Sequence, residues 1–257
     1  MRRVAPSPAL SAGQQAAASR GLKPMIPIGS RPFLDYVLES LADAGLRQVC
    51  LVIGPGGSEI REHYTRTARP PAPLSLEFAV QAQPLGTAHA VLAAESFAAG
   101  DSFLSVNADN LYPGSALQAL RRLPRAGLAG WRRSTLLSRS NFSAERIGAF
   151  ALIEVNTAGE LARIVEKPGP MDAEAFGPDP MVSMNAWVLP PTIFEACRAI
   201  EPSTRGELEL PQAVRHAIER LDERFRVVES NEGVLDLSHP GDIPAVEARI
   251  RAGKLPT

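Results

Sequence analysis

Residues 74–110, LSLEFAVQAQPLGTAHAVLAAESFAAGDSFLSVNADN, decide the fold of this chain. They open on an alternating apolar run, turn through Gly86, continue in helix-forming residues at 90–95 and end in a second apolar run that reaches Asp109. This order predicts strand, turn, helix and strand. Asp109 would then lie just past the carboxyl end of a strand, where open α/β sheets place ligands and metals.

The glycine turn has the features of a ligand site. Gly86 carries no side chain, so a flat ligand can lie against its backbone. The next helix is expected to begin at or near Thr87, and the free N–H groups of its first turn attract anions. The turn therefore predicts a binding site close to Asp109.

The preceding segment continues the same alternation. Residues 31–46 have the apolar spacing of an amphipathic helix, residues 49–53 form a continuous apolar run, and residues 58–64 suit a short helix. A continuous apolar run is typical of a parallel strand buried on both faces. We therefore predict an α/β, Rossmann-like fold, with a mixed, mostly parallel sheet and helices on both faces.

In the second half of the chain, helices and strands no longer alternate regularly. Two strands at 147–155 and 161–165 flank a hairpin turn at 156–159, and a later strand is expected at 182–189. Further elements are predicted as helices at 115–123, 191–200, 210–221 and 240–251 and strands at 126–131, 225–228 and 233–237.

Composition limits the function classes. The 257 residues are 45% hydrophobic and 21% charged, which is typical of a globular protein, and the net charge of -1 gives no bulk electrostatic case for nucleic acid or membrane partners. Cys50 and Cys197 each lie in an apolar stretch, as buried reduced thiols do. No run has the length of a membrane span or the form of a signal peptide, so a cytoplasmic protein is expected.

Four charged residues suggest phosphate chemistry. Asp109 and Asp236 could hold Mg²⁺ together, since this ion prefers oxygen ligands shared with substrate phosphates. Lys23 and Lys167 each precede a proline, and the stretch around Lys23 is expected to be an extended, rigid loop. Lysine is a point charge suited to phosphate. The alternatives are a turn cap for Asp109, an edge-strand charge for Asp236 and a surface position for Lys23. Gly148 suits either a β-bulge or the close approach of a ligand.

Six short motifs then point to one family. The chain resembles the sugar-1-phosphate nucleotidyltransferases, or nucleotide-sugar pyrophosphorylases, from about residue 21 to residue 251. Its metal motif differs in Ala108, where the family usually has glycine. The matching segments are QAQPLGTA (81–88), NADN (107–110), VEKP (165–168), MNA (184–186), RGELE (205–209) and LD (235–236).

The resemblance implies one nucleotidyltransferase domain over residues 1–257, with a GT-A-like fold. It implies attack of a sugar 1-phosphate on the α-phosphorus of a nucleoside triphosphate, with loss of pyrophosphate and with Mg²⁺ as cofactor. The resemblance favours UTP or dTTP and a glucose-type sugar as substrates. It leaves open whether the protein forms a homo-oligomer. The residues that the resemblance assigns are Asp109 and Asp236 for Mg²⁺, Lys23 for the triphosphate, Lys167 for the sugar phosphate, Gln81, Gly86 and Thr87 for the nucleotide, and Gly148, Glu166 and Asn185 for the sugar.

The N-terminal segment, about residues 1–20, is atypical for that family, and residues 11–21 are predicted to form a short alanine-rich helix that ends at Gly21. The family opens with a strand and a glycine-rich phosphate loop, whereas here Ser11-Ala12-Gly13 is the only trace, and Pro6 and Pro8 do not suit a central strand. In one explanation the strand and loop lie upstream of Met1, and residues 1–257 alone release little pyrophosphate. In the other, the protein is a catalytically inactive sugar-nucleotide-binding or regulatory relative. We expect the first, because both aspartates, Gln81 and Lys167 are present.

Overall fold

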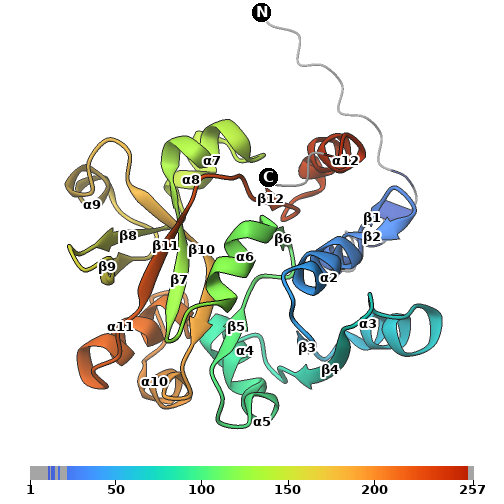
Figure 1. The fold of residues 1–257 in the computed structure, drawn as a ribbon, viewed down its shortest axis with the longest axis horizontal. Coiled ribbons are helices and arrows are strands. Elements are labelled where there is room, and N and C mark those ends of the chain that lie inside the picture. Colours follow the sequence, from blue (N-terminus) through green and yellow to red (C-terminus); the bar gives the residue numbers. More distant parts are fainter. Residues whose placement is uncertain (1–10, 12, 15–16, 18–21, 254–257) are drawn as a thin grey trace, which may run out of the picture.

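A mixed sheet crosses the centre of the molecule and has helices on both faces (Figure 1). The computed structural model describes residues 11, 13–14, 17 and 22–253. The strands are β1 (Pro27–Ile28), β2 (Arg31–Pro32), β3 (Gln48–Ile53), β4 (Ser75–Val80), β5 (Phe103–Ser105), β6 (Asn110–Leu111), β7 (Gly127–Arg132), β8 (Ala151–Val155), β9 (Leu161–Val165), β10 (Met181–Leu189), β11 (Arg226–Ser230) and β12 (Leu235–Asp236). The helices are α2 (Phe33–Asp43), α3 (Ser58–Glu62), α4 (Thr87–Ala93), α5 (Glu95–Ala98), α6 (Gly114–Arg121), α7 (Arg133–Arg139), α8 (Ala144–Gly148), α9 (Pro170–Ala175), α10 (Ile193–Ala199), α11 (Leu210–Arg220) and α12 (Ile243–Arg251).

The strands pair in both directions. The main sheet has the order β11-β7-β10-β8-β9, and β5 pairs with the second half of β10. β11 runs parallel to β7, whereas β10 runs antiparallel to β7, β8 and β5. β3 and β4 form a separate parallel pair of six residues each. The predicted α/β fold with a mixed sheet is thereby confirmed.

Alternation along the central strands divides the core into two layers. In β7, Leu128 packs with α4, α10 and α11, whereas Ala129 and Trp131 pack with α2, α6 and α12. Successive side chains of a strand point to opposite faces, so the two groups of helices cover opposite faces of the sheet. Trp131 and Trp187 are both fully buried, one in each layer.

Several local predictions need correction. The strand expected from residue 147 begins only at Ala151, because Ser143 caps helix α8 by accepting a hydrogen bond from the Arg146 N–H at 3.3 Å. Lys23 and Pro24 lie in a 3-10 turn and not in an extended loop. The predicted alanine-rich helix at 11–21 falls mostly outside the described residues, although residues 13–14 and 17 are helical.

No helix in the described part of the chain is long and apolar enough to span a membrane.

Candidate active site

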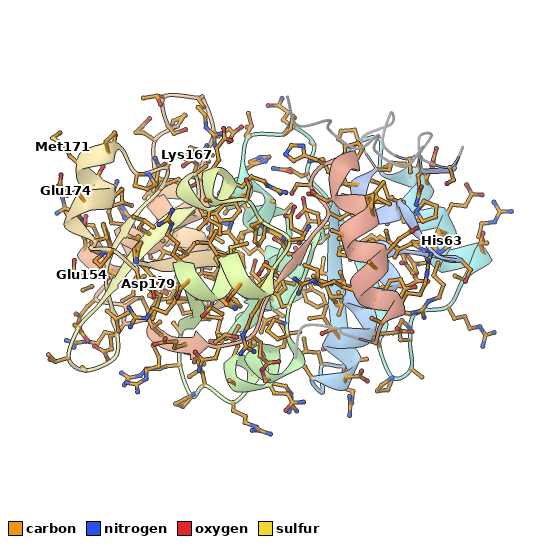
Figure 2. The ribbon with its side chains drawn as sticks, turned by 90° about the horizontal axis from the view of Figure 1, so that it is seen from above. His63, Glu154, Lys167, Met171, Glu174 and Asp179 are labelled. Carbon is orange, nitrogen blue, oxygen red and sulfur yellow. The ribbon has the colours of Figure 1, made fainter. Side chains whose placement is uncertain are left out.

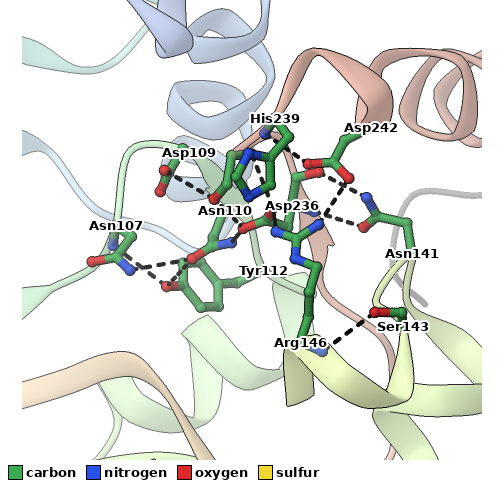
Figure 3. Close-up of polar contacts among 11 residues, drawn as sticks. Asn107, Asp109, Asn110, Tyr112, Asn141, Ser143, Arg146, Asp236, His239 and Asp242 are labelled. Atoms are coloured by element: carbon green, nitrogen blue, oxygen red, sulfur yellow. Dashed lines mark hydrogen bonds and ion pairs between the residues drawn. The ribbon is translucent and has the colours of Figure 1, made fainter. Parts of the chain in front are cut away.

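The ladder between β6 and β12 brings the two predicted metal ligands together. Asp236 pairs with Asn110 across this antiparallel ladder, and the Leu237 N–H donates to the Asp109 carbonyl oxygen at 2.9 Å. Asp109 follows β5 after a short loop, so it lies at the carboxyl end of that strand, as predicted. Two carboxylates that are distant in the sequence therefore meet at one edge of the sheet (Figure 3).

Asp236 is only 4% exposed and is held by hydrogen bonds on both carboxylate oxygens. Its Oδ2 accepts from Asn110 Nδ2 and from Ser238 Oγ, each at 2.8 Å. Its Oδ1 accepts from the Ser238 N–H at 2.9 Å and forms an ion pair with Arg146. Asn141 fixes the backbone by bonding the Asp236 N–H and carbonyl, both at 2.8 Å (Figure 3). These bonds compensate the desolvation of a buried charge.

Asp109 has much weaker support. Its Oδ2 lies 3.3 Å from Ser238 Oγ, the same hydroxyl that bonds Asp236. A serine hydroxyl has one proton and can donate to only one of these carboxylates at a time. Burial raises the pKa of Asp109, and the charge of Asp236 raises it further, while the charge of Lys23 opposes the shift. The pair of carboxylates would thus be stabilised by an added cation.

This donor set fits Mg²⁺. The ligands offered are hard carboxylate oxygens, and Mg²⁺ is usually bound by one or two carboxylates together with substrate phosphates and water. Among the described residues no group of three or more His, Cys, Asp or Glu side chains forms a metal cluster. A cation here would therefore depend on oxygens supplied by a bound substrate.

Three residues at the site, Arg146, Asp242 and Ser238, were not predicted from the sequence. Arg146 pairs with Asp236 and also with Asp242, which lies 2.8 Å away. Burial raises the pKa of Asp242, although the Asp242 carboxylate accepts from the His239 N–H and faces Arg146. Sequence position was the one signal that could have found two of them. Arg146 stands two residues before the predicted site residue Gly148, and Ser238 stands two residues after the predicted site residue Asp236.

A second charged cluster surrounds Lys167. Its Nζ lies 4.0 Å from Glu209 Oε1, which also accepts from Arg205 Nη2 at 2.8 Å. Burial raises the pKa of Glu166, and Glu209 adds to the shift, while Lys167 and Arg205 oppose it. Lys167 has φ +46°, a left-handed conformation that is uncommon for a residue with a side chain. Figure 2 shows Lys167 in the half of the molecule that contains Met171 and Glu174, away from His63.

Asn185 also adopts a left-handed conformation, with φ +57°. Its Oδ1 accepts from Trp187 Nε1 at 3.3 Å, which fixes the amide. Asn185 and Thr87 line the same cavity as Ala108, the residue before Asp109. The structure therefore places one residue predicted for the sugar and one predicted for the nucleotide around one space, whose lining ends at the residue before Asp109.

Gln81 and Gly86 contact each other, as expected of one site. Gln81 Nε2 donates to the Gly86 carbonyl at 2.9 Å and lies 3.2 Å from His89 Nδ1. Gly86 has φ +106°, and a Cβ there would lie 2.4 Å from the Leu208 carbonyl oxygen. The glycine is therefore required by packing against residue 208, whatever else binds to it.

Thr87 does not cap the helix that follows. Gly86 is the cap residue of α4, whereas Thr87 Oγ1 accepts from the Leu210 N–H at 2.8 Å. The Ala88 N–H donates to the Leu208 carbonyl at 2.9 Å, so one of the free donors expected for anions is already used. Fewer donors are therefore free here than expected, and the anion site at this helix start stays a prediction.

Gly148 ends helix α8 and is not a bulge in a strand. A Cβ at this position would meet nothing within 4 Å. Packing therefore does not demand the glycine, and the approach of a ligand stays a prediction.

Known proteins resemble this chain in sequence over most of its length. A family model described as nucleotidyl transferase matches residues 18–249. The chain belongs to this nucleotidyl transferase family. Glucose-1-phosphate thymidylyltransferase of Streptomyces antibioticus is 32% identical over 197 residues, which are 77% of this chain and 51% of the relative. Bifunctional protein GlmU of Methanococcus vannielii is 27% identical over 221 residues, 86% of this chain and 48% of GlmU.

The chain thus spans about half the length of these curated relatives. UTP–glucose-1-phosphate uridylyltransferase AglF of Haloferax volcanii is a shorter relative, 24% identical over 89% of this chain and 88% of AglF. A UDP-glucose pyrophosphorylase solved with UDP-glucose matches the fold with a TM-score of 0.69, at 19% identity and over 90% of each chain. The predicted fold class is confirmed by this match.

Proposed function

We propose that this protein transfers a nucleotidyl group to a sugar 1-phosphate and releases pyrophosphate. The observation that carries the proposal is the convergence of Asp109, Asp236 and the charge of Lys23 at the carboxyl end of β5. UTP or dTTP and glucose 1-phosphate are the favoured substrates, because the named relatives include a thymidylyltransferase and a uridylyltransferase for glucose 1-phosphate.

The chemistry asks the protein to position and neutralise two polyanions. The attacking oxygen belongs to a phosphate monoester whose second pKa is about 6, so at neutral pH it needs no general base. The protein must hold this oxygen in line with the α-phosphorus and offset the charge that develops. Mg²⁺, when held by Asp109 and Asp236, would supply positive charge to the reacting phosphates.

The other side chains divide the remaining work. Lys23 is exposed on its turn and faces Asp109, so it is free to neutralise the triphosphate or the leaving pyrophosphate. Lys167 would hold the sugar phosphate by exchanging its distant contact with Glu209 for a closer anion. Glu166 and Asn185 would meet sugar hydroxyls, as would the backbone of Gly148.

Gln81 would read the base. Its Nε2 is directed to Gly86, which leaves the carbonyl oxygen Oε1 as an acceptor. Uracil and thymine present an N–H donor on the pairing edge, and Gln81 Oε1 would accept from it. Guanine also presents an N–H donor on this edge, so the preference for UTP and dTTP rests on the relatives and not on Gln81.

Pyrophosphate release tests the proposal. The protein is incubated with Mg²⁺, one of four nucleoside triphosphates and glucose 1-phosphate or another hexose 1-phosphate. Whatever the amount released, it should be greatest with UTP or dTTP, should be lost on chelation, and should drop about a hundredfold or more in Asp109→Asn, the scale of removing one electrostatic contact from a reacting centre. Asp43→Asn, at an exposed carboxylate near the end of α2, is the matched control.

Two outcomes would oppose it. Full turnover of Asp109→Asn would remove Asp109 from the reaction. Tight binding of a nucleotide-sugar without pyrophosphate release from any substrate pair would favour the regulatory, binding-only relative.

A further inference from the structure

The Ser238 hydroxyl lies between the two carboxylates of the proposed metal site. Its Oγ is 2.8 Å from Asp236 Oδ2 and 3.3 Å from Asp109 Oδ2. Ser238 is half-buried, whereas Asp236 is buried. Three side-chain oxygens from two distant segments of the chain therefore lie together.

Hydrogen bonds fix the backbone that carries this hydroxyl. The Ser238 N–H donates to Asp236 Oδ1 at 2.9 Å, and the Leu237 N–H donates to the Asp109 carbonyl oxygen at 2.9 Å. Asn141 bonds both the N–H and the carbonyl oxygen of Asp236 at 2.8 Å. The fold itself therefore sets the position of Ser238 Oγ relative to both carboxylates.

Every acceptor position of the Asp236 carboxylate is in use. Oδ1 accepts from the Ser238 N–H and from Arg146. Oδ2 accepts from Asn110 Nδ2 and from the Ser238 hydroxyl, both at 2.8 Å. A carboxylate offers about four acceptor positions, and these four donors fill them. A cation can therefore bind Asp236 only if one of the donors gives way.

The Ser238 hydroxyl gives way at the least cost. Its proton rotates about the Cβ–Oγ bond while the oxygen stays in place. Asn110 is 2% exposed and its own Oδ1 accepts from Asn107 Nδ2 at 3.3 Å, while Arg146 is also held by Asp242 at 2.8 Å. Once the hydroxyl proton turns away, a lone pair of Ser238 Oγ becomes available on the side of the two carboxylates.

The spacing of the three oxygens suits Mg²⁺. This ion holds oxygen ligands at about 2.1 Å in an octahedron, so adjacent ligands lie about 3 Å apart. The separations of 2.8 and 3.3 Å around Ser238 Oγ lie on either side of that value. A serine or threonine hydroxyl holds Mg²⁺ in P-loop enzymes, so the oxygen is also of a suitable type.

We propose that the Ser238 hydroxyl is a third protein ligand of the cation, beside Asp109 and Asp236. The inference rests on the metal site of the proposed function and adds a neutral oxygen to its two carboxylates. In the alternative role, Ser238 only bridges the carboxylates and competes with the cation for them. The two roles predict opposite changes in metal affinity when the hydroxyl is removed.

The first measurement is the affinity of the protein for Mn²⁺ in the presence of each of the four nucleoside triphosphates, without a sugar phosphate. Mn²⁺ favours the same oxygen ligands as Mg²⁺. Its binding to a protein increases the relaxation of water protons, so affinity is measured without turnover. Ser238→Ala should weaken the binding about tenfold, the lower end of what the loss of a metal-site partner costs.

Ser238→Cys adds a spectroscopic signature of direct coordination. A thiolate is a metal ligand, and its bond to Co²⁺ gives an ultraviolet charge-transfer band that a hydroxyl does not give. Co²⁺, added with the triphosphate that binds most tightly, should produce this band in the variant and not in the parent. The parent's own thiols, half-buried Cys50 and buried Cys197, set the background.

Ser134 is the matched control. Its Oγ donates to Asp179 Oδ2 at 2.7 Å and its N–H donates to Asp179 Oδ1 at 2.8 Å, so it makes with one carboxylate the contacts that Ser238 makes with Asp236. Ser134→Ala and Ser134→Cys should keep the Mn²⁺ affinity and the Co²⁺ spectrum of the parent. The fluorescence of buried Trp131 and Trp187 reports whether each variant is folded.

Unchanged or tighter Mn²⁺ binding in Ser238→Ala overturns the proposal, as does Co²⁺ bound to Ser238→Cys without the sulfur band. Equal effects in the Ser134 variants overturn it too. A parent that binds Mn²⁺ with none of the triphosphates overturns it together with the metal site of the proposed function.

The proposed reaction can fail separately. Pyrophosphate release by the parent, with unchanged Mn²⁺ binding in Ser238→Ala, overturns the role of Ser238 alone. The tenfold loss and the sulfur band in a protein that releases no pyrophosphate would overturn the reaction and support Ser238 as a ligand.

Discussion

Replacing Gly86 by alanine separates the packing role of this residue from its expected contact with the nucleotide base. Gly86 has φ +106° and ψ 179°, a backbone conformation open essentially only to glycine, and its occupation by alanine costs about 1–3 kcal/mol. The new Cβ would lie 2.4 Å from the Leu208 carbonyl oxygen and 2.8 Å from its nitrogen. Backbone atoms cannot rotate away, so overpacking adds about 1–3 kcal/mol.

The expected loss in the free energy of unfolding is therefore about 2–6 kcal/mol. Gly100→Ala is the control, because Gly100 has φ +88° but a Cβ added there would meet no atom within 4 Å. It should show the backbone cost alone. Urea unfolding, followed by the fluorescence of buried Trp131 and Trp187, measures both variants. A loss in Gly86→Ala no larger than that in Gly100→Ala would refute the packing argument and leave base binding as the reason for the glycine.

Three further substitutions test the site by stability. Tyr112→Phe should cost about 1–3 kcal/mol in urea unfolding, since the Tyr112 hydroxyl donates to the buried Met184 carbonyl at 2.6 Å; an unchanged midpoint would contradict this. Asp236→Asn should cost about 1–3 kcal/mol, because Arg146 loses one of its two carboxylate partners and keeps Asp242, and an unaltered stability would show that the pair is not formed. Asp109→Asn, without Mg²⁺, should be more stable than the parent at neutral pH, because a carboxyl whose pKa rises on folding opposes folding when ionised. Thermal unfolding should show that gain disappearing as the pH falls through the raised pKa toward the ordinary value of about 4, and a gain that persists in acid would contradict the assignment.

Much of the fold could be predicted because its elements obey local rules. Apolar spacing or turn residues within a short stretch are enough to predict three of them, since these signals do not depend on distant parts of the chain. They are the helix ending near Gly45, the hairpin at 156–159 and the strand ending before Asp109. The strand start expected at residue 147 is wrong because an apolar pattern does not distinguish a capped helical turn from the beginning of a strand. The capping serine at 143 is the signal that would have moved the boundary.

The two carboxylates of the site could be predicted from the sequence, but the residues that hold them in place could not. Asp109 and Asp236 could be named because each stands at the end of, or within, a short apolar run. Arg146 and Ser238 could not be assigned, because their roles depend on the β6–β12 ladder, which joins segments that no local pattern relates. Gly86 shows the converse case, since a residue predicted for ligand binding has a packing role against residue 208 that spacing does not reveal.

The apolar run at 49–53 shows where a correct strand prediction still differs from the structure. Its composition predicts a strand buried on both faces, yet Val49, Cys50, Leu51 and Val52 are only partly buried. These four residues border the cavity between β3 and β5, so their partial exposure comes from that cavity and not from an error in the predicted strand. Composition predicts how apolar a strand is, but it does not show which of its edges the rest of the chain covers.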